Sequence, residues 1–382
     1  MSHGLLGDWM RIAVRVKILI SCAILLLGCI ANGRGRNCNA ELPALSGPPV
    51  LLQMIRDDAV HAELKLTDQQ RTRILSALRE VDAPWFRSRN LESEARELEI
   101  RKLTRQLEQR LRLILDAVQQ QRLLQLQFQA LGTRMLLRDD VASMLKLSKT
   151  QSESLKSAFQ ATDRAIVQLP RSGAEAEQSE RIRQLKQREL DSVTEQLTAD
   201  QERRLGDLAG TGFDFSSVRR TYPFAPELTL DGVIWIQGGP LSLADLKGKV
   251  VAVHFYAFQC INCQRNLPHY KAWWEDYADR GLVVIGLQTP ETAAERHIEQ
   301  VRAAAKREAM KYPVLLDLES ANWKNWSNTM WPTVYLIDRQ GFLRRWWQGE
   351  LNWQGGDGEQ QMRRTIEQLL AEPLLAEPLL AE

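Results

Sequence analysis

The sequence predicts a multidomain chain in which an all-α domain with an internal duplication precedes an α/β domain with a central mixed sheet flanked by helices. Three observations predict this fold class. Residues 51–212 are almost free of proline and rich in Gln, Glu, Arg and Leu. Short motifs within this segment recur about eighty residues further on. Beyond Thr221, short apolar runs alternate with helical patterns, and nine of the eleven tryptophans lie there.

Composition bounds the class of protein. The 382 residues include 50 Lys and Arg against 48 Asp and Glu, which gives a formal net charge of +2. Because a dedicated nucleic-acid binder presents a strongly basic surface, we expect no nucleic acid among the partners. Hydrophobic residues make up 44% of the chain, which is typical of globular proteins. Five cysteines are too few for the disulfide scaffold of a small secreted domain.

Residues 1–30 have the pattern of a signal peptide or lipoprotein signal. Basic residues precede the uncharged apolar run Ile18–Ile30, which is too short to span a bilayer core of roughly 30 Å comfortably. The segment Leu26–Cys29 resembles a bacterial lipobox, so Cys29 is a candidate for lipidation. A small-x-small cleavage site at Cys29–Ala31 and an uncleaved signal anchor are the alternatives. All three place the rest of the chain outside the cytoplasmic membrane, and two of them tether it there.

Residues 31–50 are predicted to be a flexible tether, and residues 51–212 a duplicated helical domain. Within the latter, apolar residues between Leu91 and Ile114 recur mostly at spacings of three and four, as on an amphipathic helix. In each copy, Thr, Ser or Asp is followed three residues later by Gln, which is the pattern of a capping box or a close relative of one. These motifs predict four helix starts, near Thr67, Asp116, Ser148 and Thr198.

The four boxes resemble the LTxxQ motif of Spy-like periplasmic helical proteins, some of which are chaperones or stress sensors. The resemblance covers only these short motifs. It implies a periplasmic chaperone or stress-binding domain with an accessory redox domain as an alternative function. Because capping alone explains the motif, a helical spacer or a dimerisation module remains open beside it.

Residues 221–368 are predicted to form the α/β domain, followed by a low-complexity tail at 369–382. The run at Val250–Val253 is continuous, apolar and largely β-branched, as in a central strand buried on both faces. The expected strands and helices, in order, are Val250–Phe258, Cys260–Ala278, Leu282–Leu287, Ala293–Met310, Val314–Leu316, Val334–Ile337, Phe342–Trp347 and Glu359–Leu370.

A cysteine pair stands between the first of these strands and the helix that follows it. Cys260 and Cys263 form a CxxC motif at the expected amino terminus of that helix. Free amides and the helix dipole favour a thiolate there, so Cys260 is the expected nucleophile. Cys263, one turn further on, is placed to resolve a mixed disulfide. The motif therefore predicts reversible thiol–disulfide exchange.

The surrounding motifs resemble the thioredoxin superfamily, and more closely its TlpA-like and DipZ-like extracytoplasmic branch, over roughly residues 222–370. They are Phe255–Ala257 before the CxxC, Asn266–Pro268 after it, Gly281–Gly286 and Trp331–Thr333. The resemblance implies a protein-disulfide oxidoreductase that needs no cofactor or metal. Its implied partners are thiol- or disulfide-containing proteins and a membrane or extracytoplasmic electron-transfer protein. The dipeptide Ile261-Asn262 carries no cation, which favours the reductase direction.

The same resemblance assigns roles to residues around the cysteines. Pro332 takes the place of the family's cis-proline beside the CxxC, and Trp331 and Thr333 become candidates for substrate docking. His254 stands where thioredoxins carry a buried Asp. It is therefore either a replacement proton acceptor for Cys263 or a core histidine with satisfied nitrogens.

The cysteines have three alternative uses besides exchange. A zinc site could draw on the CxxC with His254 and His269, but a structural zinc site usually has a second pair of ligands elsewhere in the chain. A peroxidase would carry Thr three residues before its reactive cysteine, where this chain has Ala257. A static structural disulfide is the third alternative. Cys38, in the expected tether, is the odd cysteine of the chain.

Overall fold

The computed structural model describes residues 49–169 and 175–373. These residues form two compact units, each with its own core. The first unit is helical and contains residues 49–78 and Leu91–Thr221, and the second contains Arg79–Asn90 together with the chain from Tyr222 onward. The expected signal segment with Cys29, most of the tether with Cys38, and residues 374–382 lie outside the described part of the chain. The fold class is confirmed: an all-helical region precedes a mixed-sheet α/β domain.

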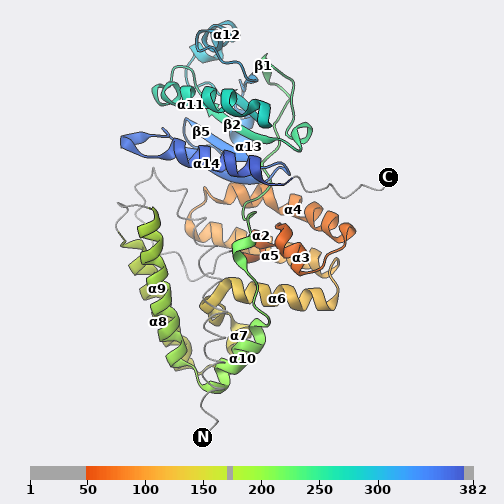
Figure 1. Cartoon of the computed structure of the whole chain (residues 1–382), viewed down its shortest axis with the longest axis vertical. Helices are drawn as coiled ribbons and strands as arrows, with labels where there is room; N and C mark the ends of the chain where they lie inside the picture. The colour runs from red at the N-terminus through yellow and green to blue at the C-terminus, as the bar shows by residue number, and fades with distance from the viewer. Residues whose placement is uncertain (1–48, 170–174, 374–382) are drawn as a thin grey trace. The chain divides into compact units, whose positions relative to one another are not determined.

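The helical unit consists of helices joined by short turns (Figure 1). Its α-helices are α2 (Val50–Met54), α3 (Asp58–Glu63), α4 (Asp68–Ser88), α5 (Ser93–Arg112), α6 (Ala117–Leu131), α7 (Asp139–Met144), α8 (Lys149–Val167), α9 (Glu175–Gln196) and α10 (Ala199–Ala209). The last turns of α4 extend beyond Leu78 and belong to the second unit.

All four helix starts predicted from capping boxes are confirmed. Helices α4, α6, α8 and α10 each begin one residue after the expected cap. In α6, for example, the Gln119 amide donates to the Asp116 carboxylate at 2.8 Å, and the Asp116 amide donates back to Gln119 Oε1 at 3.0 Å. Each box therefore satisfies two backbone donors at a helix start.

The capping glutamines also bind one another in pairs, and this arrangement occurs once in each copy of the duplication. Gln70 Nε2 donates to Gln119 Oε1 at 2.7 Å, and Gln151 Nε2 donates to Gln201 Oε1 at 2.9 Å. Within each copy, one capping box is thus joined to the other by its glutamine side chain. The motif that starts a helix also fixes the pairing of two helix starts distant in sequence.

The second unit is built on one mixed six-stranded sheet with the strand order β1-β4-β3-β2-β5-β6. The central strand β2 pairs in parallel with β3 and antiparallel with β5. The strands are β1 (Ile234–Gln237), β2 (Val250–Tyr256), β3 (Leu282–Gln288), β4 (Val314–Leu316), β5 (Thr333–Ile337) and β6 (Leu343–Gln348); the α-helices are α11 (Ile261–Tyr277), α12 (Ile298–Arg307), α13 (Ala321–Asn325) and α14 (Gly358–Ala371).

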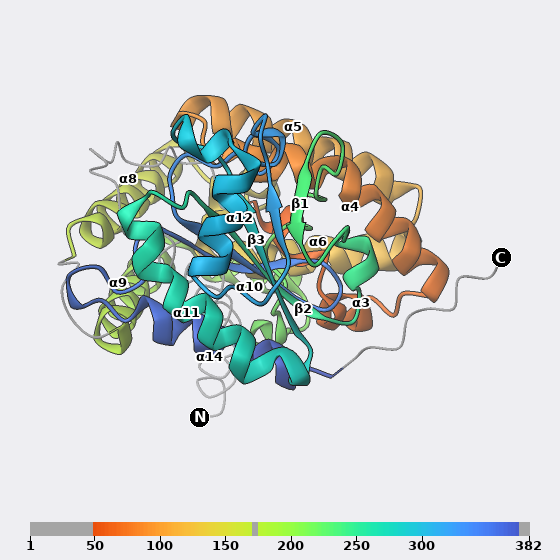
Figure 2. The same cartoon turned by 90° about the horizontal axis from the view of Figure 1, so that it is seen from above.

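Each face of this sheet packs against its own apolar cluster. Residues of α11 and α14 cover one face, and these two helices lie side by side (Figure 2), joined by a hydrogen bond from Trp273 Nε1 to the Glu359 carboxylate. On the opposite face, Phe255 and Tyr335 pack with Trp326. Because both faces are covered, every residue of β2 is buried, as its continuous apolar sequence predicts.

The end of α4 completes the second of these clusters. Phe86 is buried there and meets the rings of Tyr335 and Trp346 edge-on, at centroid distances of 6.0 and 6.3 Å. Arg89 lies over the Phe86 ring at 3.6 Å and donates to the carbonyls of Trp326 and Ser327 at 2.5 and 3.0 Å. Residues 79–90, which the sequence assigns to the helical domain, therefore supply part of the core of the α/β unit.

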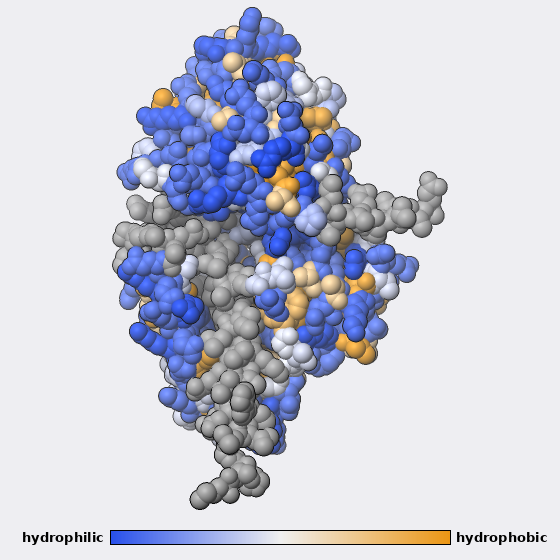
Figure 3. Space-filling view, in the orientation of Figure 1, coloured by the Kyte–Doolittle hydropathy of each residue, from blue (hydrophilic) through white to orange (hydrophobic). Residues whose placement is uncertain are grey.

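The face of the molecule drawn in Figure 3 is mainly polar where its residues are described. Figure 3 shows hydrophilic residues predominating on the face it draws, with small apolar patches between them. Among residues 49–169 and 175–373, no helix combines the length and apolarity that crossing a bilayer requires.

The paired glutamines predict a specific loss of stability. We expect Gln119→Ala to lower the unfolding free energy by about 1–2 kcal/mol, because it removes a capping box and a side-chain pair together. The control is Gln121→Ala on the exposed face of the same helix. Urea unfolding of the full chain followed by circular dichroism measures the difference, and equal midpoints for the two variants would contradict the role given to the pair.

The contact of Phe86 with the sheet predicts a larger loss of stability than that expected for Gln119→Ala. We expect Phe86→Ala to destabilise the α/β unit by about 3–5 kcal/mol, the usual range for removing a buried aromatic side chain. Most tryptophans lie in this unit, so tryptophan fluorescence during urea unfolding reports on it. Arg87→Ala, one residue away and exposed, is the control. A Phe86→Ala midpoint equal to that of the control would show that α4 adds nothing to this core.

Candidate active site

The strand β2 and the helix α11 fix the position of the CxxC. After Tyr256 the chain makes a turn, in which the Cys260 amide donates to the Ala257 carbonyl at 3.1 Å. Cys260 then takes the N-cap position of α11 with extended backbone, and Gln264 donates to its carbonyl at 3.0 Å. The nucleophile therefore lies at the amino end of a helix, directly after a strand whose every residue is buried.

Cys260 is partly exposed, and its environment favours the thiolate. A hydrogen bond from the Cys263 thiol is the largest cause, and backbone amides of Cys263 and Asn262 add to it; together they outweigh burial and lower the pKa of Cys260 to about 6. Amides at a helix start and the helix dipole are the expected source of this stabilisation. A large fraction of Cys260 is therefore ionised at neutral pH.

Cys263 differs because it is buried. Only 1% of its surface is exposed, and it belongs to the apolar cluster that joins α11 to the sheet. Burial, and next its hydrogen bond to Cys260, raise the pKa of Cys263 far above the ordinary thiol range. The two cysteines, which are both free thiols here, thus have opposite properties: one sulfur is reachable and acidic, and the other is enclosed and protonated.

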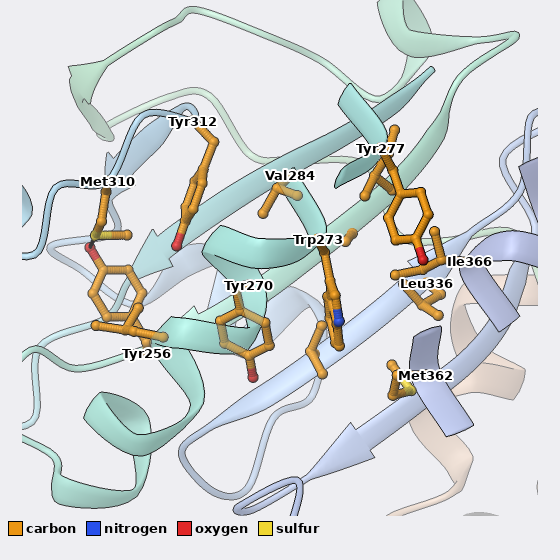
Figure 4. Close-up of a cluster of buried hydrophobic side chains, with 14 of the residues drawn as sticks. Tyr256, Tyr270, Trp273, Tyr277, Val284, Met310, Tyr312, Leu336, Met362 and Ile366 are labelled. Carbon is orange, nitrogen blue, oxygen red and sulfur yellow. Dashed lines mark hydrogen bonds between the residues drawn. The ribbon is translucent and has the colours of Figure 1, made fainter. Parts of the chain in front are cut away.

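His254 contacts aromatic residues of the same cluster, among them Tyr270 and Tyr312, which Figure 4 labels. It is fully buried and stacks on Tyr270, with a centroid distance of 4.3 Å, and its Nε2 pairs with the Tyr312 hydroxyl at 3.1 Å. Its Nδ1 is buried and has no hydrogen-bond partner among the described residues. Burial lowers the pKa of His254 to about 3. Because burial disfavours the protonated ring, His254 is poorly suited to accept a proton from Cys263. As a core histidine it has a hydrogen-bond partner at Nε2 but none at Nδ1 among the described residues.

The segment Trp331–Thr333 leads into strand β5, which lies between β2 and β6 in the sheet. The Trp331–Pro332 peptide bond is cis. Trp331 is half-buried and stacks on Trp323 at 4.0 Å, and both Trp331 and Cys260 pack against the cluster that contains Cys263. Thr333 is fully buried, and its hydroxyl donates to the Met330 carbonyl at 2.9 Å. Its side chain therefore faces the interior, whereas Trp331 retains exposed surface.

Two buried polar residues at the site were not among the candidate site residues that the sequence predicted. Asn266, on α11, donates to the Gly349 carbonyl at 3.1 Å and accepts from the Leu351 amide at 2.9 Å. Glu295 accepts from backbone amides, including that of Gln259. Both side chains bind main-chain groups of loops distant in sequence. The sequence pointed to Asn266 only as part of the motif Asn266–Pro268, and no motif included Glu295.

The arrangement of the two cysteines suits exchange chemistry. Among the residues that the structure describes, no group of three or more His, Cys, Asp or Glu side chains could hold a metal ion. An acidic, partly exposed thiol beside a buried one can attack a disulfide and then be released by its neighbour.

Comparisons with known proteins find similarities to the α/β unit. Residues 224–346 match the model of the AhpC/TSA family. Protein DipZ of Mycobacterium tuberculosis is 46% identical over 105 residues, which are 28% of this chain and 15% of DipZ. Thioredoxin-like protein YneN of Bacillus subtilis is 32% identical over 120 residues, which are 31% of this chain and 66% of YneN. A solved thiol-disulfide isomerase from Corynebacterium glutamicum is 25% identical and covers 39% of this chain and 98% of its own, with a TM-score of 0.34.

These matches concern a part of each protein. The match to this chain spans about 15% of the length of the DipZ proteins. The residues that match the family model lie inside the α/β unit, and the helical unit is outside that match.

The buried His254 predicts a pH dependence of stability. Below about pH 6.5 the unfolded chain takes up a proton on this ring, whereas the folded chain does so only near its lowered pKa of about 3. The unfolding free energy of the α/β unit should therefore fall as the pH drops through this window. His254→Gln, which cannot take up the proton, should show a shallower fall.

Urea midpoints of the two proteins between about pH 7 and pH 5 measure the difference. His297→Gln serves as the control, because that side chain is exposed. Parallel pH profiles for wild type and His254→Gln would contradict the buried neutral state.

Proposed function

We propose that this protein, whose C-terminal part is a thioredoxin-like domain with a Cys260 and Cys263 pair, is a thiol-disulfide oxidoreductase that exchanges disulfides with protein partners outside the cytoplasmic membrane, acting mainly as a reductant. The observation that carries this proposal is the contrast between the two cysteines. Cys260 is partly exposed and acidic, and Cys263 is buried and protonated beside it.

The reaction follows from this contrast. The Cys260 thiolate attacks one sulfur of a partner's disulfide, which forms a mixed disulfide and releases the first partner sulfur as a thiolate. Cys263 then loses its proton and attacks the Cys260 sulfur, which releases the second partner sulfur. The Cys260–Cys263 disulfide forms, and the partner gains two electrons and two protons. A second protein must return electrons to the pair for another cycle, and we propose a membrane or extracytoplasmic electron-transfer protein for this step.

The surface beside Cys260 suits an extended protein segment. Ile261 between the cysteines is 57% exposed, and Trp331 retains exposed surface next to the same cluster. Apolar side chains at the site favour a partner that presents apolar residues next to its cysteine. The direction of electron flow rests on the uncharged pair Ile261 and Asn262, since that dipeptide lacks the cations that would stabilise a thiolate further.

The proposed location rests on the amino-terminal sequence. Basic residues followed by the apolar run Ile18–Ile30 have the order of an export signal, and Cys29 follows a small residue as in a lipobox. A lipid on Cys29, or an uncleaved signal segment, would tether the chain to the membrane with both units outside the cytoplasm.

Trapping of the mixed disulfide tests the function and the location together. We expect Cys263→Ala, expressed as the full chain, to accumulate covalent complexes with proteins, because nothing remains to release the partner from Cys260. Non-reducing electrophoresis of separated cytoplasmic, periplasmic and membrane fractions should show these complexes in the membrane fraction.

The control is the double variant Cys260→Ser with Cys263→Ala, which retains Cys22, Cys29 and Cys38. Complexes that persist in the double variant would refute the role of Cys260, and complexes confined to the cytoplasmic fraction would refute the location. Wild-type protein should also reduce insulin with dithiothreitol as the electron source, and the loss of that activity in Cys260→Ser completes the test.

A further inference from the structure

A fully buried carboxylate lies in an otherwise exposed loop after strand β3. Glu295 has no exposed surface, whereas Glu291, Thr292, Arg296 and His297 around it are exposed. A buried carboxylate is costly unless hydrogen-bond donors surround it. The chain therefore folds this loop around Glu295.

Glu295 accepts three backbone hydrogen bonds. Its Oε1 accepts from the Gln259 amide at 2.7 Å. Its Oε2 accepts from the amides of Glu291 and Thr292, at 2.7 and 2.9 Å. One carboxylate thus joins its own loop to the residue immediately before Cys260.

A second bond joins the same two segments. The Thr292 hydroxyl donates to Gln259 Oε1 at 2.5 Å. The other polar groups of the turn before Cys260 are held locally: the Ala257 carbonyl by the Cys260 amide, and the Phe258 carbonyl by Gln264 Nε2 at 2.9 Å. The Gln259 amide is held from outside the turn, because it donates to the Glu295 carboxylate.

We propose that Glu295 is a positioning residue for the exchange reaction, which holds the turn before Cys260 so that the sulfur stays at the first amides of α11. This inference rests on the proposed function of the cysteine pair. Glu295 touches neither sulfur nor substrate in this proposal, and acts through the backbone of Gln259.

A positioning role and a direct electrostatic role of Glu295 predict opposite changes in the pKa of Cys260 when the Glu295 carboxylate is removed. If Glu295 positions the turn, its loss lets Cys260 leave the amides of Asn262 and Cys263, and the pKa of Cys260 rises toward that of an ordinary thiol. If the negative charge acts directly on the thiolate, its removal lowers the pKa of Cys260. A merely structural role lowers stability and leaves this pKa unchanged.

The test is the pH dependence of Cys260 alkylation in the reduced full chain, with the labelled peptide identified by mass spectrometry. For Glu295→Gln we expect the midpoint to rise from about 6 toward about 8, which decreases the thiolate fraction at pH 7 roughly tenfold. Glu299→Gln on α12, which removes an exposed carboxylate, should leave the midpoint unchanged.

Thr292→Val keeps the inference testable if Glu295→Gln does not fold. Thr292 is exposed, so this variant should fold, and it should raise the midpoint by a smaller amount through the loss of the Gln259 bond. An unchanged or lowered midpoint in a folded Glu295→Gln, or an unchanged midpoint in Thr292→Val when Glu295→Gln does not fold, would overturn the inference. The alkylation profile needs no substrate, so a wild-type protein inactive in insulin reduction would refute the proposed function and leave this test standing.

Discussion

The chemistry of the α/β unit depends on where helix α11 begins. Cys260 occupies the N-cap position of this helix, one short turn after the central strand β2, so the sheet fixes the position of the sulfur and amides at the helix start stabilise its charge. Packing of the same helix against the sheet buries Cys263 one turn further on. A single strand–turn–helix junction thus produces one acidic thiol and one protonated thiol, although the residue type is the same. Because Cys260 is partly exposed and Cys263, one helical turn away, is buried, the two thiols have different pKa values.

The loops around this junction are held by buried polar side chains from other elements. Asn266 binds the loop after β6, Glu295 binds the turn before Cys260, and Arg89 at the end of α4 binds the segment that leads toward Trp331. Each of them contacts main-chain groups, so loop conformation depends on side chains that lie elsewhere in the sequence. This arrangement places reactive and partner-facing residues on loops while a rigid scaffold sets their positions. The contribution of α4 also means that the α/β unit is not encoded by one continuous stretch of chain.

The sequence was informative where the structure is set locally. The apolar run at Val250–Val253 predicts a buried central strand, and each capping box predicts a helix start, because both depend on neighbouring residues. The bonds of Glu295 to Gln259 and of Asn266 to Leu351 span 36 and 85 residues, and no local pattern announces them. The short strand β1 was likewise missed, since its four residues carry too weak an alternation to stand out. Thr333 was expected at a docking surface, but β5 pairs with strands on both sides and encloses it.

The most direct test of this account is a pH titration of both thiols in the reduced wild-type protein. The titration is monitored by NMR of protein labelled with ¹³C at the cysteine Cβ atoms. The resonance of Cys260 should titrate with a midpoint near 6, and that of Cys263 should stay at its thiol position through about pH 9. If both resonances titrated together near about pH 8.5, as ordinary thiols do, the junction of β2 and α11 would not distinguish the two sulfurs and the account would fail.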